Sequence, residues 1–178
     1  MDALERQLGA VTRHLDRREL FYVFTGELAL RMLGCTDTVG TIELLVNLTA
    51  EERGRFFDFL EQEGYETRSR WRGPVTFSPR AGGAALRLRL AGSAADMATI
   101  GRRVPVTLGY VSLFIPSYED LVLNLLSDAE MGEREVAAFY LRFQNYMDME
   151  YLVTGARERS VYPRFVRMKI RAGKLAGG

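Results

Sequence analysis

The stretch that decides the fold runs from Tyr22 to Val46 and reads YVFTGELALRMLG at 22–34 and, after a short gap, TIELLV at 41–46. The aromatic and β-branched run ending at Phe24 predicts a strand. Gly26 permits a tight turn, and the apolar residues after it predict a short helix that stops near Gly34. The first turn of such a helix presents free N–H groups, so a phosphate site at Gly26 is expected.

The second part of this stretch predicts a strand that carries a single acid. Successive side chains of a strand point to opposite faces of the sheet. One face is therefore wholly apolar, whereas Thr41 and Glu43 lie on the other. The order is strand, glycine turn, short helix and a strand with one carboxylate.

This order resembles the nucleotidyltransferase superfamily, which is DNA polymerase beta-like, in its minimal, antitoxin-type branch. The family strand reads Arg-x-Thr-x-Asp-Ile-Asp-Leu-Leu-Val, and the apolar part of 41–46 matches it. Thr41 occupies the first Asp position and Glu43 the second. Asp37 and Val39 stand where Arg and Thr are usual. The resemblance therefore indicates the fold, with degeneracy at the metal-binding acids.

The resemblance extends to later segments. The run IPSYEDLVLNLL at 115–126 is similar to the helix after the last family strand, with Asn124 where a Lys is usual. Asp148 matches a late helix acid. The resemblance implies an α/β (α+β) fold, in which a mixed, mainly antiparallel sheet has helices on one face and is followed by a C-terminal helical lobe.

Local patterns predict the boundaries of the parts. An amphipathic N-terminal helix is expected within 1–19, a nucleotidyltransferase-like core within 20–115, a helical lobe within 116–155 and a basic C-terminal tail within 156–178. Thr49 and Glu52 form a capping-box pattern at a helix start. Residues 85–91 alternate as a strand, and 133–154 read as one long helix.

The family chemistry needs two or three carboxylates on neighbouring strands, which hold divalent cations. This chain offers Glu43, a vestigial catalytic candidate, whereas the polar face of 85–91 carries Arg87 and Arg89. A carboxylate flanked by guanidinium groups forms an ion pair and does not gather Mg²⁺. We therefore expect Glu43 to pair with one arginine, with no metal site and no cofactor. The alternative is a weakened Mg²⁺ site that adds Asp37 or Glu27.

Two sets of residues are candidates for binding. The first could hold a phosphate or other ligand at the glycine turn and comprises Thr25, Gly26, Glu27, Thr41, Arg87 and Arg89. The second could form a platform for a nucleic-acid strand and comprises Arg68, Arg70, Trp71 and Arg72. A solvated sheet face with cross-strand ion pairs to Glu63 or Glu66 is the simpler explanation of the second set.

Composition limits the remaining possibilities. Apolar residues make up 47% of the 178, and the net charge is +1. Residues 155–178 hold seven basic residues and one acid, so this segment carries +6 against −5 for the rest. The single cysteine, Cys35, is expected to be a buried thiol, and His14 a surface residue. No signal peptide or membrane-spanning run is visible, so a cytoplasmic protein is expected.

Three functions fit these observations. The first is a catalytically degenerate nucleotidyltransferase-like protein that binds a nucleotide, a nucleic acid or a protein partner. The second is an active, metal-dependent enzyme that transfers a nucleoside monophosphate to protein or RNA, as antitoxin-like relatives of the family do. The third is a non-catalytic structural subunit. An aromatic stripe at 140–151 would also suit a homodimer.

Overall fold

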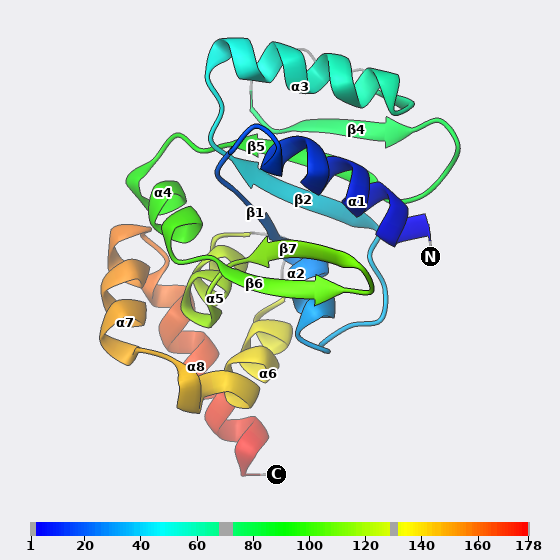
Figure 1. Cartoon of the computed structure of the whole chain (residues 1–178). Coiled ribbons are helices and arrows are strands. Elements are labelled where there is room, and N and C mark those ends of the chain that lie inside the picture. Colours follow the sequence, from blue (N-terminus) through cyan, green and yellow to red (C-terminus); the bar gives the residue numbers. More distant parts are fainter. Residues whose placement is uncertain (1–2, 68–72, 129–131, 178) are drawn as a thin grey trace. The chain divides into compact units, whose positions relative to one another are not determined.

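The chain forms an α/β unit followed by a helical unit in the computed structural model, which describes residues 3–67, 73–128 and 132–177. The two compact units comprise residues 1–115 and 116–178 (Figure 1). The division between the two units falls after residue 115.

The first unit is built on a five-stranded sheet. Its strands are β1 (Tyr22–Thr25), β2 (Thr41–Val46), β3 (Tyr65–Glu66), β4 (Val75–Pro79) and β5 (Ala85–Leu90). The strand order is β1-β2-β5-β4-β3, in which β2 and β5 run parallel and the other neighbours run antiparallel. A separate hairpin joins β6 (Val104–Leu108) to β7 (Val111–Ile115). The mixed, mainly antiparallel sheet predicted from the sequence is confirmed.

Two long helices cover the apolar face of this sheet. They are α1 (Ala3–Asp16) and α3 (Ala50–Gln62), and α3 begins with the predicted Thr49–Glu52 capping box. Phe57 of α3 packs edge-on against Phe77 of β4, with ring centroids 4.8 Å apart. The Tyr22 hydroxyl of β1 donates to Asp16 at 2.9 Å and so ties the sheet to α1. Burial of these apolar side chains is the main force that holds the layers together.

The opposite face of the sheet is only partly covered. The short helix α2 (Gly26–Met32) follows β1, and α4 (Ala94–Gly101) packs Ile100 against Val23 and Leu45. No helix is predicted from the sequence over 94–101, although Ser93 and Asp96 form a capping box at the start of α4. Because α4 covers only the Val23–Leu45 end, the polar residues further along β2 and β5 stay accessible.

The second unit is helical and differs from the sequence interpretation at two points. It contains α5 (Tyr118–Ser127), α6 (Glu133–Phe143), a 3-10 turn (Gln144–Tyr146), α7 (Met149–Glu158) and α8 (Tyr162–Ala176). The single helix expected over 133–154 is wrong, because the Asp148 side chain accepts the Glu150 and Tyr151 N–H groups and starts a new helix.

The basic segment 156–178 is the second point of difference. It was expected as a C-terminal tail, and in the structure it is mostly helical and has a buried side. Most of it forms α8, which packs on α6 and buries Phe165, Met168 and Ala172. These residues recur at spacings of three and four, so they line one side of a helix. No helix among the described residues is both long and apolar enough to cross a membrane.

Candidate functional site

The candidate site begins at the glycine turn between β1 and α2. Gly26 has a φ of +62°, and a Cβ atom built there would lie 2.7 Å from Glu43 Oε2. A side chain would therefore be strained by the backbone and would collide with the carboxylate. The turn needs glycine because Glu43 lies directly against it.

A row of polar residues crosses four strands at this level. Thr25 of β1 is opposite Glu43 of β2, Glu43 is opposite Arg87 of β5, and Arg87 is opposite Thr76 of β4. Because directly opposite residues share a face, all four side chains project from the same side of the sheet. We call Thr25, Glu43, Arg87 and Thr76 the polar row.

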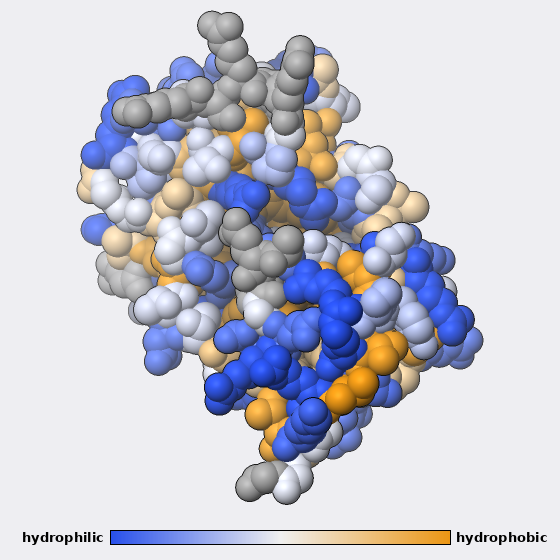
Figure 2. All heavy atoms as spheres, turned by 180° about the vertical axis from the view of Figure 1, so that it is seen from behind, coloured by the Kyte–Doolittle hydropathy of each residue, from blue (hydrophilic) through white to orange (hydrophobic). Residues whose placement is uncertain are grey.

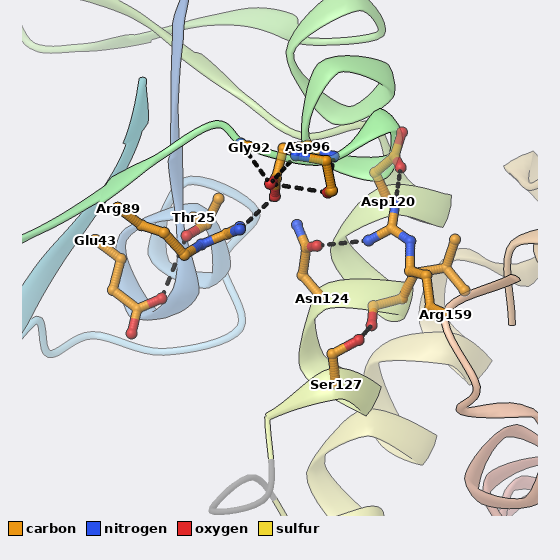
Figure 3. Close-up of polar contacts among 11 residues, drawn as sticks. Thr25, Glu43, Arg89, Gly92, Asp96, Asp120, Asn124, Ser127 and Arg159 are labelled. Carbon is orange, nitrogen blue, oxygen red and sulfur yellow. Dashed lines mark hydrogen bonds and ion pairs between the residues drawn. The ribbon is translucent and has the colours of Figure 1, made fainter. Parts of the chain in front are cut away.

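Glu43 is the only carboxylate in the polar row, and both of its oxygens are engaged. Thr25 Oγ1 donates to Glu43 Oε2 at 3.2 Å, as Figure 3 shows. Arg87 Nη1 lies 3.7 Å from Glu43 Oε1, which is ion-pair distance. The side chains of Arg87 and Glu43 are 50% and 33% exposed, so the pair is partly solvated. The ion pair predicted for Glu43 is therefore formed, with Arg87.

Arg89 is held by another acid. Its guanidinium forms an ion pair with Asp96 at the start of α4, and Asp96 also accepts the N–H groups of Gly92 and Ser93 (Figure 3). Burial alone would raise the pKa of Asp96. The Gly92 N–H, the Arg89 guanidinium and the Ser93 hydroxyl outweigh it and lower that pKa. Arg89 therefore connects β5 to α4 through an ion pair, and the ion pair of Glu43 is with Arg87.

Glu27, at the start of α2, contacts the backbone where the chain enters β2 at Thr41. Glu27 Oε2 accepts the backbone N–H groups of Gly40 and Thr41, at 2.7 Å and 3.2 Å. This carboxylate therefore closes the loop that leads into β2. Thr41, at the position where the family has its first Asp, supplies only a hydroxyl.

The residues at this site do not fit a catalytic metal pair. Divalent magnesium is bound through carboxylates in near-octahedral geometry, and the polar row offers one carboxylate that already accepts from Thr25 and faces Arg87. Across the described ranges 3–67, 73–128 and 132–177, no group of three or more His, Cys, Asp or Glu side chains could hold a metal ion. The donor chemistry suits an ion pair better than a cation.

A phosphate at the Gly26 turn is also disfavoured by this geometry. The Glu43 carboxylate lies against the turn where an incoming anion would have to sit. Two anions at that distance would repel each other. Phosphate binding by Gly26 stays a prediction, and the half-exposed Arg87 is the better placed cation.

Six other candidate residues differ from the sequence expectations or lie outside the described residues. Cys35 is exposed, so the buried thiol expected there is wrong; the residue lies beyond the end of α2, where no helix covers it. His14 is not a simple surface residue, because its ring stacks on Phe59 with centroids 3.9 Å apart. The nucleic-acid candidates Arg68, Arg70, Trp71 and Arg72 lie outside the described residues.

The second unit contains a buried polar cluster that sequence reasoning missed. Asp120 is fully buried, and its carboxylate accepts from Arg159 Nη2 at 2.7 Å and from the Tyr151 hydroxyl at 3.0 Å. Arg159 also donates to Asn124 Oδ1 at 2.7 Å (Figure 3). The Ser117 hydroxyl accepts the Asp120 N–H as a helix cap, and such a pattern indicates only a helix start. The cluster joins α5 to α7 and serves as a structural anchor.

Comparison with solved structures identifies the fold. No protein-family model matches the sequence, and no curated protein is similar to it in sequence. The crystal structure of ANT(2'')-Ia in complex with adenylyl-2''-tobramycin superposes with a TM-score of 0.65 at 17% identity, covering 90% of this chain and 99% of that one. The nucleotidyltransferase TM1012 from Thermotoga maritima gives a TM-score of 0.54 at 14% identity, covering 83% and 97%. The chain therefore has a nucleotidyltransferase-like fold.

Proposed function

We propose that this protein is a catalytically degenerate nucleotidyltransferase-like protein that acts by binding a partner. One observation carries the proposal: Arg87 stands on β5 directly opposite Glu43, the only carboxylate of the polar row. Metal-assisted nucleotidyl transfer needs several carboxylates to hold the cations that neutralise a triphosphate. A guanidinium beside a lone carboxylate cancels much of its negative charge and so disfavours a cation there.

A nucleotide is the first partner to test. ANT(2'')-Ia, which has the same fold, is seen with an adenylylated product. Here the half-exposed Arg87 could hold a phosphate of a nucleotide without Mg²⁺. A nucleic acid, or a protein partner as in antitoxin-type relatives of the resembled family, would be the binding target if nucleotides fail.

The test separates binding from transfer. Isothermal titration calorimetry with nucleoside triphosphates, in Mg²⁺ and in EDTA, measures binding. Pyrophosphate release with a panel of acceptors that includes tobramycin, protein and RNA measures transfer. We expect binding that survives EDTA and weakens about tenfold in Arg87→Gln, the loss of one charge-assisted contact. Arg55→Gln is the matched control, because Arg55 is an exposed residue of α3 that pairs with Glu51.

One result would overturn the proposal in favour of an active enzyme. Pyrophosphate release that depends on Mg²⁺ and disappears in Glu43→Gln would show that Glu43 still serves transfer. The same release in both proteins would instead indicate a contaminating activity.

A further inference from the structure

A pocket on the helix-covered side of the first unit is lined by an unusual density of arginine. It lies between α1 and α3 and has a volume of about 560 Å³. Its wall includes Arg13, His14, Arg17, Arg18, Phe59 and Glu63, which we call the arginine pocket. Small-molecule sites commonly have volumes of roughly 300–1,000 Å³. Glu43 projects from the other face of the sheet, so this pocket is separate from the polar row.

The arginines gather here because of helix geometry. Arg13 lies in the last turn of α1, and Arg17 and Arg18 follow just beyond the end of that helix, where the Arg17 N–H donates to the Arg13 carbonyl oxygen. Basic residues near a helix C-terminus interact favourably with the negative end of the helix dipole, but that end is equivalent to only about half a negative charge. Within the described part of the chain, no carboxylate lies at ion-pair distance from any of the three guanidinium groups. Arg18 interacts electrostatically with Glu52 at the start of α3, and the pocket wall itself still carries more positive than negative charge.

Charge and shape together specify the ligand. Three arginines against Glu63 leave a formal charge of +2 when His14 is neutral. A phosphate monoester above its second pKa, about 6, carries two negative charges. Guanidinium groups match phosphate oxygens in geometry. Phe59 supplies an apolar wall for the organic part of such a molecule.

The protonation of His14, which lines the arginine pocket, should depend on what the pocket binds. Its ring stacks on Phe59, and its Nε2 atom is buried without a hydrogen-bond partner. Burial, and then the positive charge of Arg18, lower the pKa of His14. Among the other charged groups on the packed helices, Arg13, Arg17 and Glu63 line the same pocket, and the Glu52 carboxylate accepts the Thr49 N–H at the start of α3. A bound dianion would favour the protonated imidazole.

We propose that the arginine pocket binds a small phosphate monoester in its dianionic form, held by Arg13, Arg17 and Arg18, with the His14 ring in the same wall. The proposal goes beyond the function proposed for the polar row and does not depend on it. Pyrophosphate release reports on Glu43, whereas the experiment below reports on His14.

The chain contains a single histidine, so its imidazole resonances report on this pocket without assignment ambiguity. The intact protein is titrated with phenyl phosphate at about pH 7 and followed by imidazole NMR, and the His14 titration midpoint is then measured with and without the saturating ligand. We expect a saturable shift of the His14 resonances and a rise in the His14 pKa on binding. Phenyl sulfate, a monoanion, should bind at least about tenfold more weakly.

Variants identify the contacts. Arg17→Gln should weaken phenyl phosphate binding about tenfold, while Arg55→Gln on the neighbouring helix should leave it unchanged. Arg17 is exposed, so the substitution should not affect folding, and an unchanged far-UV CD spectrum checks this. Three results would overturn the proposal: no saturable shift, equal binding of phenyl sulfate, or equal affinity in Arg17→Gln and Arg55→Gln. Inorganic phosphate that binds as tightly as phenyl phosphate would refute the role of Phe59.

Discussion

Removal of the Glu43 carboxylate should cost the protein about 1–2 kcal/mol of unfolding free energy. Glu43→Ala deletes an ion pair to Arg87 whose members are 33% and 50% exposed, and such pairs contribute roughly 0.2–1 kcal/mol. It also deletes the hydrogen bond from Thr25, which contributes about 1 kcal/mol because its acceptor is still partly solvated.

The exposure of Arg87 keeps the cost low. When one member of a buried pair is removed, the uncompensated charge costs about 3–5 kcal/mol. Water can solvate half of the Arg87 side chain, so that penalty does not arise here. The observed exposure therefore places the expected loss below that of a buried pair.

Urea unfolding followed by circular dichroism measures this loss, and a double-mutant cycle with Arg87→Met isolates the pair. We expect a coupling energy of about 0.5 kcal/mol that shrinks as salt is added. Glu51→Ala, which breaks the exposed pair with Arg55 on α3, is the matched control and should cost about 0.3–0.5 kcal/mol. A loss above about 3 kcal/mol for Glu43→Ala, or a coupling energy above about 2 kcal/mol, would refute the reasoning.

Three further changes test other parts of the structure. Asp120→Ala should destabilise the helical unit by about 3–5 kcal/mol, because it removes a fully buried carboxylate that pairs with Arg159, whose side chain is only 11% exposed. A loss below about 1 kcal/mol in urea unfolding would contradict this. Gly26→Ala should lower the unfolding free energy by at least about 1–2 kcal/mol because of the left-handed backbone alone. If the collision with Glu43 adds to this loss, Glu43→Ala in the same protein should recover part of the added loss, since the new Cβ would then meet no carboxylate. Strict additivity of the two substitutions would show that no collision occurs. The pKa of His14 is lowered in the folded protein, so the unfolded chain binds more protons in the range between that lowered pKa and 6.5. The unfolding free energy should therefore rise as the pH increases through this range. His14→Gln should flatten this part of the pH profile of the urea midpoint, and an unchanged profile would count against the burial of the ring.

The local sequence determined much of the first unit. Alternation in 41–46 and 85–90 was enough to place Glu43 and Arg87 on one polar face, because the side-chain period of a strand allows no other arrangement. Gly26 was identified as the turn, and Thr49 with Glu52 as a helix start, because these signals depend only on neighbouring residues.

Tertiary structure decided which charges meet. Nothing in the alternation of β5 distinguishes Arg87 from Arg89, yet α4 brings Asp96 to Arg89 and leaves Arg87 for Glu43. Likewise, the buried Asp120 of α5 accepts from Arg159, which follows α7 and is distant in sequence.

The arginine pocket shows the same limit. Sequence spacing brings Arg13 of α1 near Arg17, which follows the end of that helix, but Phe59 of α3 and the adjoining Glu63 come from far along the chain. The stacking of His14 on Phe59 depends on how α1 and α3 pack over the sheet. Local pattern therefore gave the elements and their faces, whereas the partner of each charged side chain followed only from the packing of elements distant in sequence.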